Sequence, residues 1–342
     1  MSPRPQPSLP FLLGEAEDAT REPLLGEAAA GLQAGDIIAG HRLVARLGTG
    51  GMAEVWLADA LQGTRAGKTV ALKRLLPTLR TVPAAVQRFR EEARIGALLD
   101  HPNLARTFGL FEIEGELVLI QELVGGETLG QLAVAARRRG DRLSLPAVLH
   151  AAQGLLAALD HLHVGSILPA LIHGDVTADN VVATPQGCLK LIDLGLAQPL
   201  GPDGTAPGGE GALRGTPAYM APEQVKGRPL TVRSDLFSAA VVLWELLANR
   251  PLFAGRTEFE TLQRAHEVPA PPLRAVWKEA PTVLERLFVR ALAKDPEHRF
   301  GSAAELGEAL RSAAQREGIE VGAEALAVEV ERLAPRSVRT DP

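Results

Sequence analysis

The sequence is short of several residue types, and each shortage excludes a class of protein. Cys188 is the only cysteine among 342 residues, so an intrachain disulfide cannot form and zinc-finger spacing is absent. No block of Lys and Arg occurs, and the formal net charge is −5, which argues against nucleic acid as a partner. The composition therefore fits a reducing compartment. It excludes a fold stabilised by disulfides and argues against a nucleic-acid-binding protein.

Long apolar runs are missing as well. The longest, LFSAAVVLWELLA at 236–248, is interrupted by Glu245 and is too short to span a bilayer. Residues 1–10 lack a basic stretch followed by an apolar segment, so no secretory signal is visible. We therefore expect a cytoplasmic protein with no membrane partner.

What is present is an ordinary globular composition whose texture changes along the chain. Residues 1–36, with two patches ending in LLGEA, predict a flexible extension, for which a docking segment is the alternative. Residues 37–124 carry short alternating runs and one helix-period stretch, which predict a small unit of strands with one helix. Residues 125–317 have mainly helical spacing, and residues 318–342 form an amphipathic helical tail.

A glycine-rich stretch, RLGTGGMAEVWLA, lies between two strand-like runs. Gly48, Gly50 and Gly51 let the backbone turn sharply and approach phosphate oxygens, which a Cβ would obstruct. A plain turn between strands is the alternative. Ala53 stands where a G-x-G-x-x-G pattern has its third glycine.

Lys73 ends the apolar run TVALK. Taken alone it is a surface lysine whose stem lies along a sheet edge. Beneath a glycine-rich loop it could instead bind phosphate, and it would then need an acidic partner to position it. Glu92 in the helix-period stretch could supply that partner, whereas the adjacent Glu91 should point about 100° away.

Three further polar residues follow in order along the second half of the chain. Asp175 could accept or orient a hydroxyl proton, and Asn180 and Asp193 could supply oxygen ligands to Mg²⁺. Each alone would be a solvated turn or cap residue. Together with the glycines and Lys73, they indicate phosphate transfer.

The ordered motifs closely resemble the protein kinase family, specifically bacterial eukaryotic-like Ser/Thr kinases, over about residues 40–315. The resemblance implies an α+β fold, the bilobal protein-kinase fold, in which a five-stranded antiparallel sheet with one helix stands above a larger, mainly helical part, with ATP in the cleft. The motifs that carry it are LGTGGMAEVWLA, VALK, RFREEARIGALLDHPNL, HGDVTADN, DLG, GTPAYMAPEQ, SDLFSAAVVLWELL and DPEHRF.

The resemblance also implies a role for each matching polar residue. Lys73 would contact the α- and β-phosphates of ATP and pair with Glu92. Asp175 would be the catalytic base, and Asn180 and Asp193 would hold Mg²⁺, for which Mn²⁺ could substitute. Catalysis would thus rest on Asp175, Lys73 and Asn180.

The remaining implied residues bind adenine or hold the fold. Gln121 would be the gatekeeper, and the Glu122 carbonyl and the Val124 N–H would bond adenine. The nucleotide-binding set is completed by Leu47, Gly48, Gly50, Gly51, Val55 and Ala71. A buried ion pair would join Glu223 to Arg299, and Asp235 would brace the catalytic loop.

Two departures from the family pattern affect control and rate. Gly174 replaces the arginine of His-Arg-Asp, which in the family meets a phosphate on the activation loop, and Thr205 is the only hydroxyl residue between Gly195 and Gly215. We therefore predict a non-RD kinase whose activity does not require activation-loop phosphorylation. Thr177 replaces a lysine that stabilises the transferring phosphate, which predicts slower transfer. The Gly- and Pro-rich residues 200–215 predict a mobile loop.

The implied function is transfer of the γ-phosphoryl group of Mg-ATP to serine or threonine hydroxyls of protein substrates in bacterial signalling. A pseudokinase that binds ATP and acts as a scaffold is the alternative. HGD also occurs in small-molecule phosphotransferases, but the complete GTPAYMAPEQ segment weighs against that class. Either tail is a candidate site for a regulatory partner.

Overall fold

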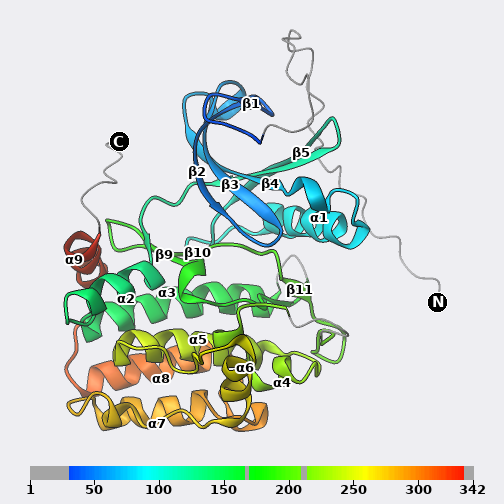
Figure 1. Ribbon diagram of the computed structural model, residues 1–342. Coiled ribbons are helices and arrows are strands. Elements are labelled where there is room, and N and C mark those ends of the chain that lie inside the picture. The colour runs from blue at the N-terminus through cyan, green and yellow to red at the C-terminus, as the bar shows by residue number, and fades with distance from the viewer. Residues whose placement is uncertain (1–30, 166–168, 209–213, 335–342) are drawn as a thin grey trace, which may run out of the picture. The chain divides into compact units, whose positions relative to one another are not determined.

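The alternating apolar runs form one antiparallel sheet in the computed structural model, which describes residues 31–165, 169–208 and 214–334. These residues divide into two units, each described by itself: unit 1 runs to Leu99 and includes Arg106–Leu123, and unit 2 comprises Asp100–Ala105 and the chain from Val124. The sheet of unit 1 has the order β1-β2-β3-β4-β6-β5 (Figure 1). Its strands are β1 (Ile37–Ile38), β2 (His41–Thr49), β3 (Ala53–Ala60), β4 (Thr69–Leu75), β5 (Thr107–Ile113) and β6 (Glu116–Glu122).

The expected five-stranded sheet was wrong by one strand. The additional strand β1 has only two residues, which pair with Arg42 and His41 of β2. Two residues are too short to show a period of two, so the pattern offered no signal for this strand. The expected hairpin at Glu114-Gly115 is present, with φ of 52° and 79°, as a two-residue turn between antiparallel strands requires.

The two faces of this sheet bury different groups. Leu72 and its neighbours form one apolar cluster, whereas Leu75 belongs to a second cluster that includes Phe89 of helix α1 (Pro83–Leu98). Because side chains alternate along a strand, Lys73 lies on the α1 face together with Leu75. Two 3₁₀ turns complete the unit: η1 (Gly63–Arg65) and η2 (Pro77–Leu79).

Unit 2 is mainly helical, with two small sheets of order β10-β9-β7 and β11-β8. Its strands are β7 (Glu127–Thr128), β8 (Leu171–Ile172), β9 (Val181–Ala183), β10 (Leu189–Leu191) and β11 (Gln198–Pro199). Its α-helices are α2 (Leu129–Arg138), α3 (Leu145–Val164), α4 (Pro222–Val225), α5 (Val232–Ala248), α6 (Glu258–Glu267), α7 (Thr282–Ala291), α8 (Ala303–Arg316) and α9 (Ala323–Leu333). Its 3₁₀ turns are η3 (Ala178–Asn180), η4 (Pro217–Tyr219), η5 (Leu273–Ala275) and η6 (Pro296–His298).

Helix α5 forms the centre of unit 2. The longest apolar run of the sequence lies in this helix, whose side chains are buried on almost every face, as a helix that is apolar all round requires. It contacts α3, α7 and β8. Among the residues that the structure describes, no helix has the length and apolarity needed to cross a membrane.

The loop predicted at 200–215 is partly described. Ala206 and Leu230 exchange two backbone hydrogen bonds of 2.9 Å, and the Gly201 N–H donates to the Thr205 carbonyl at 2.7 Å. Residues 209–213 of that prediction, and residues 1–30 of the predicted N-terminal extension, lie outside the described residues.

Candidate active site

Lys73 and Glu92 form a buried ion pair in unit 1. Lys73 Nζ lies 2.7 Å from Glu92 Oε1, and the two side chains are 10% and 1% exposed. Lys73 comes from β4 and Glu92 from α1, which packs on the same face of the sheet. A lysine held this way cannot be the solvated edge residue that its position in the sequence alone would suggest.

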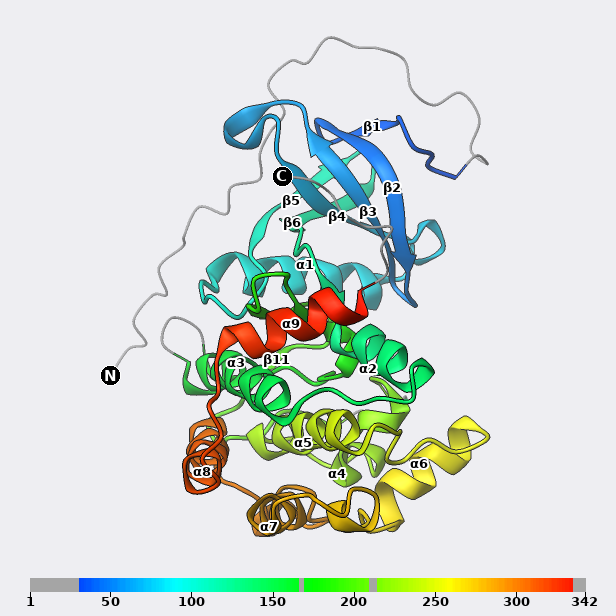
Figure 2. The ribbon, with the colours of Figure 1, turned by 90° about the vertical axis from the view of Figure 1, so that its left-hand side faces the viewer.

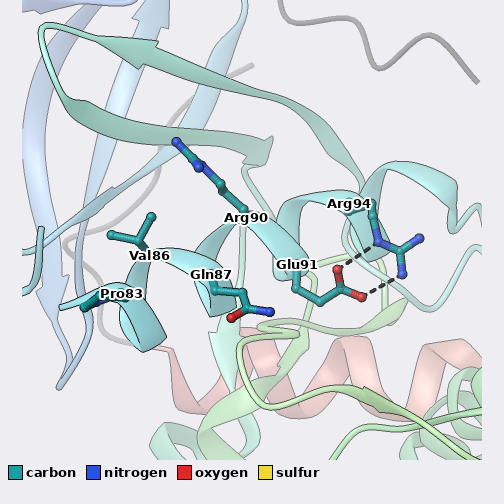
Figure 3. Close-up of a pocket in the computed structure, with 6 residues that line it drawn as sticks. All are labelled: Pro83, Val86, Gln87, Arg90, Glu91 and Arg94. Atoms are coloured by element: carbon teal, nitrogen blue, oxygen red, sulfur yellow. Dashed lines mark hydrogen bonds and ion pairs between the residues drawn. The ribbon is translucent and has the colours of Figure 1, made fainter.

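The two adjacent glutamates of α1 face different surroundings. Figure 3 shows Glu91 on the outer face of the helix, paired with Arg94 at 2.6 Å, whereas Glu92 is buried. A cavity of about 440 Å³ lies on this outer face and is lined by Pro83, Val86, Gln87, Arg90, Glu91 and Arg94. That groove therefore lies on the side of α1 away from Lys73 and does not contain the residues with candidate chemistry.

The glycine-rich loop joins β2 to β3 and is exposed. The Gly50 N–H donates to the Ala53 carbonyl at 2.8 Å and closes the turn. A Cβ at Gly48 or Gly51 would meet no atom within 4 Å, one at Gly50 would lie 3.7 Å from Ala53 O, and none of the three has a positive φ. The fold therefore has no need of glycine at these positions, and they leave room for a ligand to approach the backbone.

The predicted adenine-binding residues belong to both units. Pairing across β3, β4 and β6 matches Val55 with Lys73 and Ala71 with Gln121, so these four side chains share one face of the sheet. The Glu122 N–H donates to the Arg106 carbonyl at 2.8 Å and ends β6. Leu47 is 53% exposed on β2, and Val124 is the first residue of unit 2 after β6.

Asp175 is held by its neighbours in unit 2. Its Oδ1 accepts the Thr216 backbone N–H at 2.9 Å, and Asn180 Nδ2 donates to its carbonyl oxygen at 2.9 Å. Thr177 caps the η3 turn, because its Oγ1 accepts the Asn180 N–H at 3.2 Å, and it is only 3% exposed. The structure thus brings Asp175 and Asn180 together, and the Thr177 hydroxyl serves the loop.

Asp235, in the first turn of α5, braces the backbone before Asp175. Its buried carboxylate accepts the N–H groups of His173 at 2.8 Å and Gly174 at 2.9 Å, and His163 Nε2 at 2.9 Å. Burial by itself would raise the pKa of the Asp235 carboxyl, but the bond and charge of His163, with the Gly174 N–H, outweigh it and lower the pKa. This stabilisation is present above about pH 4 and is lost as the pH falls through the lowered pKa.

Asp193 and Asn180 flank the β9–β10 hairpin. The Ile192 N–H donates to the Asn180 carbonyl at 2.8 Å and closes the open end of the hairpin. Asp193 has a φ of 65°, which is rare for a non-glycine residue, and its Oδ1 accepts the Gly195 N–H at 3.0 Å. Backbone strain of this kind persists only where the surrounding contacts hold the residue in place, and it is common at functional sites.

The donor atoms fit a divalent cation of the Mg²⁺ type. Asp193 offers a carboxylate. Asn180 uses its Nδ2 to donate to the Asp175 carbonyl oxygen, which leaves the Asn180 Oδ1 to bind a cation. Hard oxygen donors in small number suit Mg²⁺, which usually completes its shell with phosphates and water. Within the described ranges, no group of three or more His, Cys, Asp or Glu side chains forms an all-protein metal site.

Glu223 and Arg299 form a buried two-pronged ion pair. Nη1–Oε1 is 2.7 Å and Nη2–Oε2 is 2.8 Å, and Arg299 also donates to three backbone carbonyls. Ser234 Oγ donates to Glu223 Oε1 at 2.7 Å. The pair ties α4 to the turn before α8 and to the start of α5.

Two supporting residues were missed at the sequence level. His163 on α3 contacts Asp235, and Gln224 Nε2 donates to the carbonyl oxygens of Gly174 at 3.1 Å and Arg214 at 2.9 Å. Gln224 belongs to the quoted GTPAYMAPEQ motif, which could have drawn attention to it. His163 lies in an ordinary helical pattern that contains no such signal.

This geometry agrees with the comparison to known families. The family model for the protein kinase domain matches residues 41–310. The chain belongs to the protein kinase domain family. Helix α9 of this kinase domain lies beyond the matched segment.

Curated relatives and a solved structure support the same assignment. The tyrosine-protein kinase MasK of Myxococcus xanthus is 32% identical over 274 residues, 79% of this chain and 42% of MasK. The probable serine/threonine-protein kinase SCO3848 of Streptomyces coelicolor is 34% identical over 265 residues, 76% of this chain and 38% of that protein. The chain therefore spans about two-fifths of the length of these relatives. The crystal structure of the Mycobacterium tuberculosis PknI kinase domain has a TM-score of 0.62 and 28% identity, covering 83% of this chain and all of that one.

Proposed function

We propose that this kinase domain transfers the γ-phosphoryl group of ATP to serine or threonine hydroxyls of protein substrates. The observation that carries the proposal is the buried Lys73–Glu92 pair at 2.7 Å, because kinases require this pair for transfer. The acceptor hydroxyl oxygen would attack the γ-phosphorus, the bond to the bridging oxygen would break, and ADP would leave. Asp175 would take the hydroxyl proton on its carboxylate.

The other residues would bind and orient the reactants. Lys73 would contact the α- and β-phosphates, and Asn180 and Asp193 would hold Mg²⁺ or Mn²⁺, which neutralises phosphate charge when bound. Adenine would bond to the Glu122 carbonyl and the Val124 N–H beside Gln121, and the glycines of the loop would cover the phosphates.

A direct test uses purified protein, labelled ATP, Mg²⁺ or Mn²⁺, and peptide acceptors that carry only serine, only threonine or only tyrosine hydroxyls. Transfer to the serine or threonine peptides is expected. Transfer to tyrosine alone would contradict the proposed acceptor class, and one relative is indeed named a tyrosine kinase. Absence of transfer to all peptides and to a general protein acceptor would contradict the activity.

A kinase-like scaffold that binds ATP is the second candidate, and one observation favours it. Thr177 is buried and its Oγ1 serves as a cap, so its hydroxyl is a poor replacement for a phosphate-stabilising lysine. Loss of one such stabiliser typically lowers the rate on the order of 100-fold. ATP binding with no transfer under all the conditions above would support this candidate.

Replacing both Gly50 and Gly51 with alanine is expected to weaken ATP binding about tenfold, or about 1.4 kcal/mol, without lowering the melting temperature. The backbone needs no glycine there: the methyl group at position 51 would meet no atom, and the one at position 50 would make only an ordinary contact with Ala53 O at 3.7 Å, so they would obstruct only a ligand. Calorimetric titration with ATP and thermal melting measure the two effects. Gly31→Ala, also in open space, is the control, and equal ATP affinity in both variants would contradict the assignment of the loop.

We further propose that activity does not depend on phosphorylation of the activation loop. Gly174 has no side chain, so position 174 supplies no cation to bind a phosphate. The backbone there also favours glycine, because φ is 79° and a Cβ would lie 3.0 Å from the Leu196 carbonyl oxygen. The Thr205 hydroxyl lies 2.9 Å from Asp203 Oδ2. A phosphate at Thr205 would therefore meet a carboxylate of the same charge.

Thr205→Ala is accordingly expected to keep the transfer rate within about twofold of wild type, because no productive phosphosite is lost. Initial rates on the preferred peptide, measured after phosphatase treatment of both proteins, check this. A large loss in the alanine variant, or a marked drop in wild type after phosphatase, would show that the loop is a switch.

A further inference from the structure

The last helix, α9, lies outside the segment that matches the kinase family, yet it packs firmly on unit 2. Leu326, Val330 and Leu333 are 0–3% exposed, and α9 contacts α3, α2 and β9. Figure 2 shows α9 lying across α3 beside α2. A helix buried on one face in this way belongs to the folded unit.

The C-terminal part of α9 is fixed by buried charge. Glu329 is 5% exposed, and its Oε1 accepts the backbone N–H of Ser144, the residue before α3, at 2.9 Å. A carboxylate at a helix N-terminus satisfies an unpaired N–H and the positive end of the helix dipole. Arg332 pairs with both Glu329 and Asp141, so this part of α9 ties down the loop before α3.

The N-terminal part of α9 lies against the turn of the β9–β10 hairpin. Gly187 in that turn has a φ of 76°, and a Cβ there would lie 2.0 Å from the Ala323 carbonyl oxygen. His150 Nε2 of α3 lies 3.0 Å from the Gly187 carbonyl oxygen. The turn is therefore held between α3 and α9 so closely that no side chain fits at position 187.

The other end of this hairpin carries the candidate metal ligands. β9 begins directly after Asn180, β10 ends two residues before Asp193, and the Ile192 N–H closes the hairpin on Asn180. Three strand residues on each side span about 10 Å from the turn to the ligands. The two strands pair in register over three residues each, and a hairpin this short couples the position of its turn to that of its open end.

We propose that α9 is a positioning element of the metal site: it holds the turn at Gly187 and thereby sets the placement of Asn180 and Asp193. The metal assignment rests on the proposed function, whereas the contact between α9 and the turn does not. A substitution that displaces the turn at Gly187 is expected to weaken metal binding about 10- to 100-fold, the usual effect of losing support for a metal ligand.

The test compares two full-length glycine variants with matched backbone strain. Gly187→Ala and Gly115→Ala both place a side chain at a φ near 77°, but position 115 has nothing within 4 Å. Mn²⁺ binding in the presence of a non-hydrolysable ATP analogue is measured by electron paramagnetic resonance, with a thermal melt for each variant. Gly187→Ala is expected to bind Mn²⁺ at least about tenfold more weakly than Gly115→Ala.

A second variant isolates the helix from the turn. Leu326→Asp puts a charge at a fully buried position of α9 and should detach the helix, so that Gly187→Ala added to it weakens Mn²⁺ binding no further. Equal Mn²⁺ affinity in the two glycine variants, or fully additive effects in the double variant, would overturn the proposal. A wild type that binds Mn²⁺ and nucleotide but transfers no phosphate would contradict the kinase activity alone.

Discussion

Replacing Asp175 with asparagine is expected to lower kcat for phosphate transfer by about 10²–10⁴-fold, the usual contribution of a positioned general base. An asparagine oxygen can still accept the Thr216 N–H that now reaches Asp175 Oδ1 at 2.9 Å, so the loop should keep its structure. It cannot take the proton of the acceptor hydroxyl. The rate of phosphate transfer should therefore fall, while ATP affinity and melting temperature stay near those of wild type.

Steady-state kinetics with the best peptide acceptor, with ATP titration in parallel, would measure this effect. Glu308→Gln is the matched control, since it removes one carboxylate from an exposed pair with Arg311 on α8. The control should behave as wild type. An Asp175→Asn enzyme that retains a kcat within tenfold of wild type would exclude Asp175 as the catalytic base.

Arg299→Ala is expected to lower the free energy of unfolding of unit 2 by about 3–5 kcal/mol, because it leaves the buried Glu223 carboxylate without its partner. Arg299→Lys should lose less, since a lysine keeps the charge but cannot reproduce the two-pronged bond. The same change at an exposed pair, Arg311→Ala, should cost less than about 1 kcal/mol.

Urea unfolding followed by tryptophan fluorescence would give these free energies. Trp56 lies in unit 1, whereas Trp244 and Trp277 lie in unit 2, so a Trp56→Phe background reports on unit 2 if the units unfold separately. A loss at Arg299 no larger than that at Arg311 would mean that the buried pair does not hold the segment around α4.

The local elements of the candidate site were predictable because their signals are local. The apolar run ending at Lys73 predicted a strand, and helical spacing predicted that Glu91 and Glu92 point in different directions, as the ion pairs with Arg94 and Lys73 bear out. The Glu114-Gly115 turn was readable from its residues. The catalytic, nucleotide and metal roles assigned to these residues came from the family resemblance and remain predictions.

Some contacts between distant segments had no signal in the sequence. His163 meets Asp235 across 72 positions, and Gln224 meets Gly174 across 50. The Thr177 hydroxyl, which stands in place of a phosphate-stabilising lysine, caps the Asn180 turn. Nothing in the spacing of these residues indicates such contacts, because they depend on how helices pack and not on the period of any one helix.

The sequence by itself determined the kinds of elements, the order of the motifs and the candidate reaction, since hydrophobic period and short motifs are properties of neighbouring residues. Only the tertiary structure decided how closely Lys73 and Glu92 approach, at 2.7 Å, that a Cβ at Gly51 would meet no atom and one at Gly50 only Ala53 O at 3.7 Å, and that Gly187 lies against α9. The reason is physical: a glycine that serves a ligand and one that serves packing are identical in the chain. They differ only in what surrounds them once the chain has folded.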